Sequence, residues 1–295
     1  MAKLGLVTVL YKSDEVLYGF FESLSKQIFS DYHLYIIDNS PSETTDSLLV
    51  ELISKFPICG VSHIRNENNN GVAKGNNQGI KLALEDGCDY ILLLNNDIEF
   101  PQENLLGDMY SCAVLEGQDI IIPKIFYYDS RTIWMAGGSI SEFKAISSHV
   151  GVDEIDIGQY DQSLYFNYAP TCFMLINRTV FDAVGLMDED YFVYYDDTDF
   201  LFRARKKGYK VYYLPKLEVF HKVSSSTGGG ETLFSIYYLN RNRIFFILKN
   251  LKFPARQISL FYTLATRAVR LLKYKLPERN QLVKAIKDGF NMKNI

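Results

Sequence analysis

In the first third of the chain, apolar blocks alternate with amphipathic blocks, and this pattern predicts strands and helices in turn. Short apolar runs rich in β-branched residues predict strands at 4–11, 33–38, 61–65 and 90–94. The stretches between them carry apolar residues at helical spacing and predict helices over 14–27, 42–56 and 72–85. Ser13 is the expected N-cap of the first helix. Wholly apolar strands that alternate with helices predict an α/β fold, with a mostly parallel sheet covered on both faces.

The pattern is less regular in the middle of the chain and becomes wholly helical at its end. Strands are predicted at 119–122, 132–140, 165–168, 210–214 and 217–220, and helices at 177–184 and 199–207. Gly208 is the expected stop of the second of these helices, and Pro254 is expected to separate two helices near the C-terminus. We therefore expect an α/β domain over 1–231, with halves at about 1–100 and 101–231, and a helical extension over 232–295.

Polar clusters follow three of the predicted strands, at 38–40, 66–77 and 95–97. In an open α/β sheet the ligand lies beyond the carboxyl ends of the strands, so these clusters mark the expected site. A carboxylate such as Asp97, placed just after a buried strand, can hold a hard cation together with substrate phosphates. The alternative is a polar turn, because Asn and Asp are common in turns.

The segment 68–79 combines asparagines with glycines spaced four apart, at Gly71, Gly75 and Gly79. On a helix this spacing places the glycines on one face, where another backbone can approach closely. The start of such a helix favours an anion, and Lys74 adds a cation. The segment is neither a P-loop nor a GxGxxG motif. The alternative is a Gly/Asn-rich loop that enters an ordinary helix.

An acidic and aromatic segment at 187–199 contains the adjacent carboxylates of Asp196 and Asp197. Neighbouring carboxylates beside aromatic rings can include one with a raised pKa that accepts a proton. The segment lacks the glycine and closing glutamate of an EF-hand; the alternative is that one aspartate caps a helix. His221 follows an apolar strand and precedes a Ser/Gly-rich run at 224–230 that could serve as a lid. A structural histidine is the alternative there.

Composition narrows the class of protein. The chain is 47% hydrophobic and 22% charged, which excludes a disordered chain, and its net charge of −4 argues against a dedicated nucleic-acid binder. The four cysteines are scattered without a CxxC pair, so we expect buried thiols in a reducing cytosol. The first residues lead directly into a strand, so no signal peptide is expected. No apolar run reaches ~18 residues, so no membrane-spanning helix is expected.

Charge is distributed unevenly along the chain. The segment 232–295 contains 13 Lys and Arg residues against only Glu278 and Asp288, so the rest of the chain is strongly acidic. Within this segment, residues 257–275 predict an amphipathic helix whose basic strip contains Arg267, Arg270 and Lys273. Such a helix can lie in an anionic membrane surface. The alternative is a helix docked on the rest of the protein with its basic edge in solvent. The predicted apolar face contains Ile258, Phe261, Leu264, Ala265, Ala268, Val269 and Leu272.

Taken in order, these motifs resemble those of family 2 glycosyltransferases, particularly the bacterial rhamnosyltransferase-like branch. The resemblance covers about residues 4–250, and the order of the motifs makes it specific. The matching segments are the opening strand with Thr8, 36–40 (IIDNS), 70–79, 94–97 (LNND), the acidic region within 172–209, and a late pair of dipeptides at 237–238 and 241–242.

The resemblance implies a GT-A fold, a nucleotide-diphosphate sugar donor, Mn²⁺ or Mg²⁺ on the diphosphate, and inversion at the anomeric carbon. It implies that Asp197 is the general base, that Asp97 and His221 bind the metal, and that Asp196 and Arg203 lie on the acceptor side. The residues implied to bind the donor nucleotide are Thr8, Asp38, Asn70, Lys74, Asn76, Asn95, Asn96 and Asp97.

The chain departs from the family pattern at three places. The metal-binding DxD motif is Asn95-Asn96-Asp97, which replaces one carboxylate with an amide and removes a negative charge. The acidic residue before the base is Asp196, which is shorter than the usual glutamate. Pro170-Thr171-Cys172 replaces the Gly-Ala or Gly-Thr that precedes an apolar strand in many relatives.

We therefore expect an inverting glycosyltransferase of bacterial surface polysaccharide synthesis that uses dTDP-rhamnose or a UDP-hexose. The acceptor would be a glycan or a polyprenyl-linked glycan. The enzyme would be cytoplasmic and would contact the inner face of the membrane peripherally through residues 257–275. It would have no nucleic-acid partner, and both a monomer and a homodimer are compatible with the sequence. Galactofuranosyl or other hexosyl transfer is the sibling alternative.

Two other classes compete with this expectation. A nucleotidyltransferase usually carries a Gly-rich basic loop after its first strand, where this chain has residues 11–14 (YKSD). A lectin-like or scaffold role would give Asp97 and Asp197 no shared function.

Overall fold

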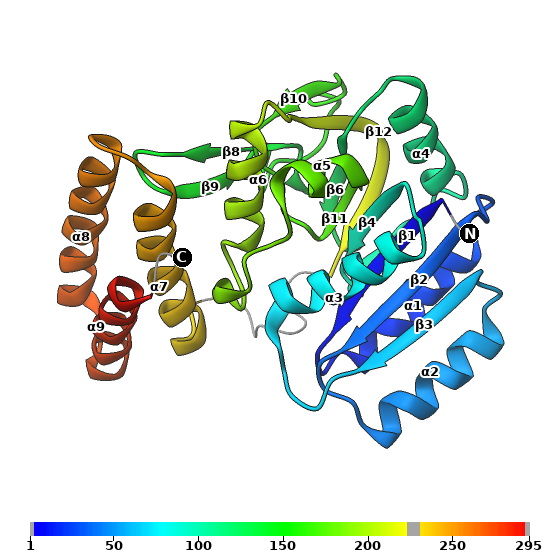
Figure 1. Cartoon of the computed structure of the whole chain (residues 1–295), viewed down its shortest axis with the longest axis horizontal. Coiled ribbons are helices and arrows are strands. Elements are labelled where there is room, and N and C mark those ends of the chain that lie inside the picture. Colours follow the sequence, from blue (N-terminus) through cyan, green and yellow to red (C-terminus); the bar gives the residue numbers. More distant parts are fainter. Residues whose placement is uncertain (1–2, 223–230, 293–295) are drawn as a thin grey trace.

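The computed structural model describes residues 3–222 and 231–292, and its first part follows the predicted alternation closely (Figure 1). The Ser/Gly-rich run at 224–230, expected as a lid, lies outside these residues. In this part of the chain, the observed helices and strands coincide with the segments in which apolar residues recur at helical or strand spacing. The elements are β1 (Leu4–Leu10), α1 (Asp14–Ser25), β2 (Tyr32–Asp38), α2 (Glu43–Lys55), β3 (Gly60–Arg65), α3 (Gly71–Glu85) and β4 (Tyr90–Leu94).

The remaining elements before the C-terminal helices differ more from the prediction. One expected strand at 132–140 is two strands, because the backbone turns at Gly137, whose φ is +103°. Two expected strands form one strand with a bulge between Leu214 and Glu218. The elements are β5 (Ile98–Glu99), α4 (Leu105–Leu115), β6 (Ile120–Tyr127), β7 (Ile133–Met135), β8 (Gly138–Ser141), β9 (Ile146–His149), β10 (Leu164–Phe166), β11 (Phe173–Asn177), α5 (Arg178–Val184), the 3-10 helix η1 (Glu189–Tyr191), α6 (Asp196–Lys206) and β12 (Val211–His221).

The main sheet has the strand order β10-β12-β6-β11-β4-β1-β2-β3, with β5 beside β12 and β7 beside β6. Strands β1 to β4 are mutually parallel, whereas β11 runs antiparallel between β4 and β6. Right-handed crossovers place α1 and α2 on one face and α3 on the other. The expected mixed, mostly parallel α/β sheet is therefore confirmed.

The glycine face of α3 packs directly on the sheet, as the four-residue spacing predicted. A Cβ added to Gly79 would lie 2.3 Å from a methyl group of Val7, and one added to Gly75 would lie 2.9 Å from Val9. Because α3 approaches β1 this closely, its N-terminus is held at the carboxyl end of the sheet. The cysteines are free; Cys88, Cys112 and Cys172 are buried, but Cys59 is exposed, so the expectation of four buried thiols is wrong there.

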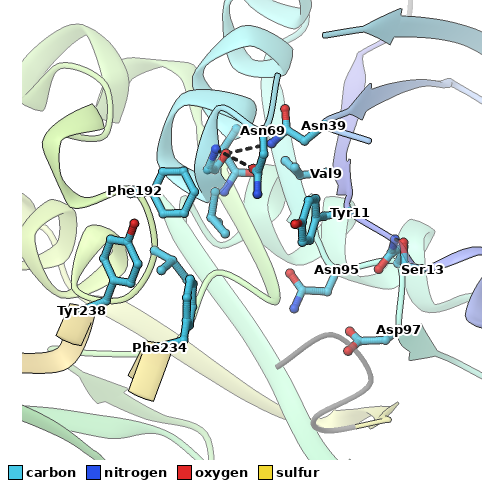
Figure 2. Close-up of a pocket in the computed structure, with 15 residues that line it drawn as sticks. Val9, Tyr11, Ser13, Asn39, Asn69, Asn95, Asp97, Phe192, Phe234 and Tyr238 are labelled. Carbon is cyan, nitrogen blue, oxygen red and sulfur yellow. Dashed lines mark hydrogen bonds between the residues drawn. The ribbon is translucent and has the colours of Figure 1, made fainter. Parts of the chain in front are cut away.

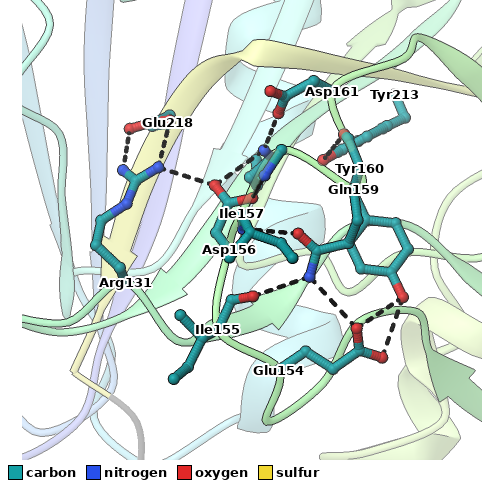
Figure 3. A network of polar contacts seen from close by, with 12 residues as sticks. Arg131, Glu154, Ile155, Asp156, Ile157, Gln159, Tyr160, Asp161, Tyr213 and Glu218 are labelled. Carbon is teal, nitrogen blue, oxygen red and sulfur yellow. Dashed lines mark hydrogen bonds and ion pairs between the residues drawn. The ribbon is translucent and has the colours of Figure 1, made fainter.

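An ion-pair network attaches the loop after β9 to strands β6 and β12 of the sheet (Figure 3). The Nζ atom of Lys124 on β6 is buried and lies 3.1 Å from Asp156 Oδ2. Arg131 contacts the same carboxylate and Glu218 of β12, each at 2.8 Å. A lysine inside a sheet needs such partners, because an unpaired buried charge is costly. The network fixes the 153–161 loop on the side of the sheet formed by β6 and β12.

The chain ends in the helices α7 (Leu233–Asn250), α8 (Ala255–Lys273) and α9 (Leu276–Asn291), and Pro254 separates the first two as predicted. Phe245, Phe246 and Ile247 of α7 belong to the same core as the sheet. Helices α8 and α9 lie on the far side of α7 from the sheet (Figure 1). A domain boundary near 231 stays a prediction. Among the described residues, no helix is long and apolar enough to cross a membrane.

The orientation of α8 differs from the docked-helix alternative considered from the sequence. Ser259 and Thr263 are its buried residues, whereas Phe261 and Leu272 are 77% and 80% exposed. Arg267 donates to Asn240 of α7, so the polar side of α8 faces the protein. The apolar side of this helix therefore faces outward.

Candidate active site

A cavity of about 400 Å³ opens at the carboxyl ends of β1 and β4, where the polar clusters were expected to meet (Figure 2). This volume is in the usual range for a small-molecule site. Figure 2 shows Asn95 and Asp97 on one side of the cavity and Phe192, Phe234 and Tyr238 on the other. The cavity is lined by Val9, Tyr11, Ser13, Asn39, Asn69, Gly71, Val72, Asn76, Asn95, Asn96, Asp97, Phe192, Val193, Phe234 and Tyr238.

Four of the expected donor-binding residues line this cavity: Asn76, Asn95, Asn96 and Asp97. Thr8, Asp38, Asn70 and Lys74 are not among its lining residues, although a chain neighbour of each of the first three is. Thr8 and Asp38 are buried beneath it, while Lys74 is exposed. The residues that the sequence prediction missed here are mainly the aromatic wall of Phe192, Phe234 and Tyr238.

Ser13 joins the two loops that carry the polar side of the cavity. Ser13 is the N-cap residue of α1, as expected, but its side chain makes no capping hydrogen bond to the helix; its hydroxyl accepts a hydrogen bond from the Asn96 side-chain amide instead. The backbone N–H of Asn95 donates to the Cys172 carbonyl at 2.8 Å. The Asn95–Asp97 turn is therefore held from β1 on one side and from the start of β11 on the other.

The carboxylate of Asp38 lies below the cavity at the end of β2. Its Oδ1 accepts from the Ser40 N–H at 2.8 Å, and its Oδ2 lies 3.5 Å from His63 Nε2. Among the described residues, ligand atoms of Asp38, Asp46 and His63 lie within 4.8 Å of one another and could hold a metal ion. Arg65 lies 3.0 Å from Asp46, and its positive charge disfavours a dication at this place.

The first turn of α3 is tied to the acidic segment. Gly71 has φ +78°, and a Cβ there would lie 2.4 Å from the Phe192 carbonyl oxygen. The Asn39 side-chain amide donates to the Gly71 carbonyl at 3.0 Å. Asn77 makes two hydrogen bonds to the Met187 backbone. The two chain segments that the resemblance associates with donor and acceptor therefore meet at one place.

Asp97 lines the cavity and is paired with His221, the last residue of β12, which is not itself a lining residue. Both residues are 7% exposed, and Asp97 Oδ1 lies 3.2 Å from His221 Nε2. The ring of Trp134 packs edge-to-face against His221, with 4.5 Å between ring centroids, and fixes its orientation. A carboxylate oxygen and an imidazole nitrogen converging beside a cavity suit a divalent cation such as Mn²⁺. The donor set thus fits the expected metal.

Three strained residues lie within the four positions that precede Asp196 and Asp197. Phe192, Tyr194 and Tyr195 all have φ between +59° and +68°, a conformation that is costly for bulky residues. The Asn242 side-chain amide on α7 donates to the backbone carbonyls of Tyr191, Val193 and Tyr194 at 2.8–2.9 Å. These bonds hold the strained loop in place, and the loop sets the position at which α6 begins.

Burial raises the pKa of both carboxyl groups at the start of α6. For Asp196 the burial, together with the charge of Asp197, raises the pKa to about 8. For Asp197 burial raises the pKa as well, against hydrogen bonds from Tyr168 and Thr198 that lower it. The Tyr168 hydroxyl donates to Asp197 Oδ2 at 2.9 Å. A carboxylate with a raised pKa and a fixed orientation is suited to accept a proton near neutral pH.

Asp97 and Asp197 are one hundred positions apart in sequence, and both lie close enough to Cys172 to act on it electrostatically, although Asp197 is not among the residues that line the cavity. Burial raises the pKa of the Cys172 thiol, and the charges of Asp97 and Asp197 both raise it further. Ring contacts run from His221 through Trp134 and His149 to Tyr168, whose hydroxyl reaches Asp197. Cys172 and this series of rings thus connect the surroundings of the two carboxylates that the sequence placed in separate motifs.

The two expected acceptor-side residues have different surroundings. Asp196 is buried beside Asp197. Arg203 donates to Asp199 at 2.7 Å and to the carbonyls of Val184 and Leu186, which joins α6 to α5. Its acceptor-side role stays a prediction, and these contacts describe a structural one.

Tyr168, Trp134 and Asn242 support the site, and sequence reasoning assigned none of them a role. Tyr168 and Trp134 reach the site only through sheet pairing between segments distant in the chain. The one available signal was the Arg241-Asn242 dipeptide, which the resemblance included without a function. Arg241 donates to the carbonyls of Asp190 and Tyr191, next to the bonds from Asn242.

Comparison with protein families and curated proteins points to one chemistry. The family model described as "Glycosyl transferase family 2" matches residues 6–185. A low-salt glycan biosynthesis hexosyltransferase of Haloferax volcanii is 24% identical over 81% of this chain and 74% of its own length. A dTDP-rhamnosyl transferase of Shigella flexneri is 22% identical over 87% of this chain and 86% of its own length. An N-acetylglucosaminyl-diphospho-decaprenol L-rhamnosyltransferase of Mycobacterium tuberculosis is 42% identical over 55 residues, 19% and 18% of the two chains.

Solved structures share the architecture of this chain. S. aureus TarS has a TM-score of 0.63 at 16% identity, and the match covers 98% of this chain and 49% of that one. A mannosyltransferase of Pyrobaculum calidifontis in complex with GDP-Man and Mn²⁺ has a TM-score of 0.60 at 12% identity. The match covers 99% of this chain and 88% of that one. At these identities the likeness concerns the fold alone.

Proposed function

The chain belongs to glycosyl transferase family 2, and from this premise we propose that it is an inverting, metal-dependent enzyme that transfers a sugar from a nucleotide diphosphate to a glycan or lipid-linked acceptor. Its fold is the GT-A fold that the motifs led us to expect. The observation that carries the proposal is that Asp97 lines the cavity while Asp197, held by the Tyr168 hydroxyl, lies within electrostatic range of the same residue, Cys172. A donor sugar between them would have its diphosphate near Asp97 and its anomeric carbon exposed toward Asp197.

In the proposed step, Asp197 accepts the proton of an acceptor hydroxyl as its oxygen bonds to the anomeric carbon. The bond between that carbon and the diphosphate oxygen breaks, and the electron pair leaves with the nucleoside diphosphate. Attack from the face opposite the leaving group inverts the configuration. Tyr168 holds the Asp197 carboxylate by its 2.9 Å hydrogen bond and so sets the direction of proton transfer.

Asp97 and His221 would hold the divalent cation, which when bound supplies positive charge to the departing diphosphate. Asn95 and Asn96 cannot add negative charge, so in this chain Asp97 is the one carboxylate of the motif. The aromatic side chains of Phe192, Phe234 and Tyr238 close the opposite wall of the cavity and exclude water from the donor.

We further propose a pyrimidine donor, dTDP-rhamnose or a UDP-hexose, with Asp38 near the base. The dTDP-rhamnosyl and hexosyl transferases among the relatives support both sugars, and galactofuranose or another hexose is the sibling candidate. In a thermal-shift screen of nucleotide sugars, we expect the true donor to stabilise the protein only when Mn²⁺ or Mg²⁺ is present. At ~100 times Kd the stabilisation is about 2.7 kcal/mol. If no uridine or thymidine nucleotide stabilised the protein with either metal, a non-enzymatic role would be favoured.

The outward apolar face of α8 supports a peripheral contact with an anionic membrane, and with it a location at the inner face of the cell membrane. Phe253, Phe261 and Leu272 are each at least 77% exposed, and the exposed Lys252, Lys273 and Lys275 lie near them along the chain. A symmetric dimer through this face would place like charges against each other, whereas anionic lipid complements them.

We expect replacement of two outward side chains, Phe261→Gln with Leu272→Gln, to weaken binding to phosphatidylglycerol vesicles about tenfold or more. Each side chain loses part of the roughly 1.5–3 kcal/mol that full burial of such a group contributes. Co-sedimentation with vesicles measures the effect. The matched control is Leu115→Gln with Ile157→Gln, two residues that are each 84% exposed elsewhere. Equal binding of both double variants to the vesicles would show that α8 takes no part in the membrane contact.

A further inference from the structure

The inward side of α8 carries arginines into a second cavity, separate from the donor cavity. This cavity has a volume of about 390 Å³ and lies between α7, α8 and the strained loop before α6. Its lining includes Tyr194, Tyr195, Asn240, Arg267 and Arg270. Arg243 of α7 lies close by and is only 4% exposed.

Positive charge in this region exceeds the negative charge that pairs with it. Arg270 is paired with Glu231, but among residues 3–222 and 231–292 no carboxylate forms an ion pair with Arg243 or Arg267. The Nε–H of Arg243 is buried without a hydrogen-bond partner in the same residues. Burial, followed by the charges of Arg243 and Arg270, lowers the pKa of Arg267 to about 10. Buried cations that lack counter-ions are costly, so the arrangement is suited to an anionic ligand.

The arginine cavity adjoins the acceptor side of the reaction centre. Tyr195 lines it and is two positions before Asp197. Burial raises the pKa of Tyr195, while the charges of Arg243 and Arg267 lower it and the charge of Asp197 raises it. The Tyr195 hydroxyl is therefore within electrostatic range of both the arginines and the proposed base. A ligand held by the arginines would lie beside the place at which the acceptor hydroxyl must stand.

We propose that this arginine cavity binds the diphosphate of a lipid-linked acceptor and thereby positions the acceptor sugar at Asp197. The inference rests on the proposed glycosyl transfer. Planar guanidinium groups bind phosphate oxygens in pairs, which gives direction as well as affinity. The outer face of the same helix, α8, is the apolar one, so a lipid chain leaving the cavity has a neighbouring surface suited to the bilayer. One side of α8 would thus contact the lipid chain, and the other side would bind its diphosphate.

The test is calorimetric titration of the full chain with geranyl diphosphate and, separately, with inorganic pyrophosphate, both in EDTA so that metal-assisted binding at the donor cavity is removed. We expect geranyl diphosphate to bind more tightly than pyrophosphate. Arg270→Gln, a half-exposed position whose loss should not unfold the protein, should weaken geranyl diphosphate at least tenfold, and Arg267→Gln should weaken it further. The matched control, Lys284→Gln with Lys287→Gln on α9, removes two exposed charges and should bind like the unaltered chain.

Four outcomes count against the proposal. Unchanged binding in both arginine variants would overturn it, and so would loss of binding in the α9 control, which would indicate non-specific attraction. Equal affinity for geranyl diphosphate and pyrophosphate would assign the cavity to a free diphosphate. Loss of binding in Asp97→Asn would assign the titration to the donor cavity. Mn²⁺-dependent donor binding should stay unchanged in the two arginine variants and in the α9 control, and it reports separately on the proposed function.

Discussion

Asp197→Asn is expected to lower kcat by a factor on the order of 10²–10⁴ while leaving donor affinity nearly unchanged, because a general base typically contributes that much to rate. The amide has the same shape and can keep the Tyr168 contact, but it cannot take the proton of the acceptor hydroxyl. Steady-state release of nucleoside diphosphate in the presence of acceptor measures the effect. Turnover near that of the unaltered enzyme would remove Asp197 from the mechanism.

The control for this variant is Asp190→Asn, which removes the same charge from an exposed position in the same segment and should turn over normally. The pH profile separates a base from a structural residue. Because burial raises the pKa of Asp197, the rate should increase with pH along a limb that lies above the usual ~3.9 of aspartate. Tyr168→Phe removes a hydrogen bond that lowers this pKa, so it should move the limb to higher pH.

Asp97→Asn is expected to reduce kcat/KM by a factor on the order of 10²–10³, the usual effect of removing one group that stabilises charge in the transition state. The motif already has amides at Asn95 and Asn96, so this substitution leaves it without a carboxylate. His221 would be the remaining ligand of the pair. Donor binding in the presence of Mn²⁺, followed by calorimetry, should weaken in parallel with the rate.

Asp108→Asn on α4 is the matched control, since it removes one exposed carboxylate that does not line the donor cavity and should change neither quantity. Donor binding should also weaken when EDTA is added to the unaltered enzyme, and Asp97→Asn should respond little to the chelator. Full Mn²⁺-dependent binding in Asp97→Asn would show that another group holds the metal. The Asp38, Asp46 and His63 group would then be the candidate to examine.

The parts of the fold that depend on local pattern could be predicted from the sequence. The first four strands are short apolar runs, and the glycine spacing of α3 correctly indicated close packing on Val7 and Val9. Strand β12 was divided in two because Pro215 interrupts its pattern, whereas the bulge after Leu214 lets the strand continue. Helix α4 was missed because its residues are apolar on most sides and show little helical period.

The site was predictable where a motif carries its own chemistry and not where it depends on distant contacts. Asp97 and Asp197 could be named from the resemblance, but Tyr168 and Asn242 act through hydrogen bonds across 29 and 48–51 positions. For α8, the sequence established two faces, apolar and basic. Which face turns inward is decided by partners such as Asn240 and Glu231, and these lie on other segments.

The central claim is that two carboxylates act on opposite sides of one donor sugar, and a paired measurement on their variants tests it most directly. Mn²⁺-dependent donor binding and transfer rate should be measured together for Asp97→Asn and Asp197→Asn. We expect Asp97→Asn to lose donor binding along with rate, and Asp197→Asn to bind the donor normally and lose only the rate. Equal loss of donor binding in both variants, or a normal rate in either, would contradict it.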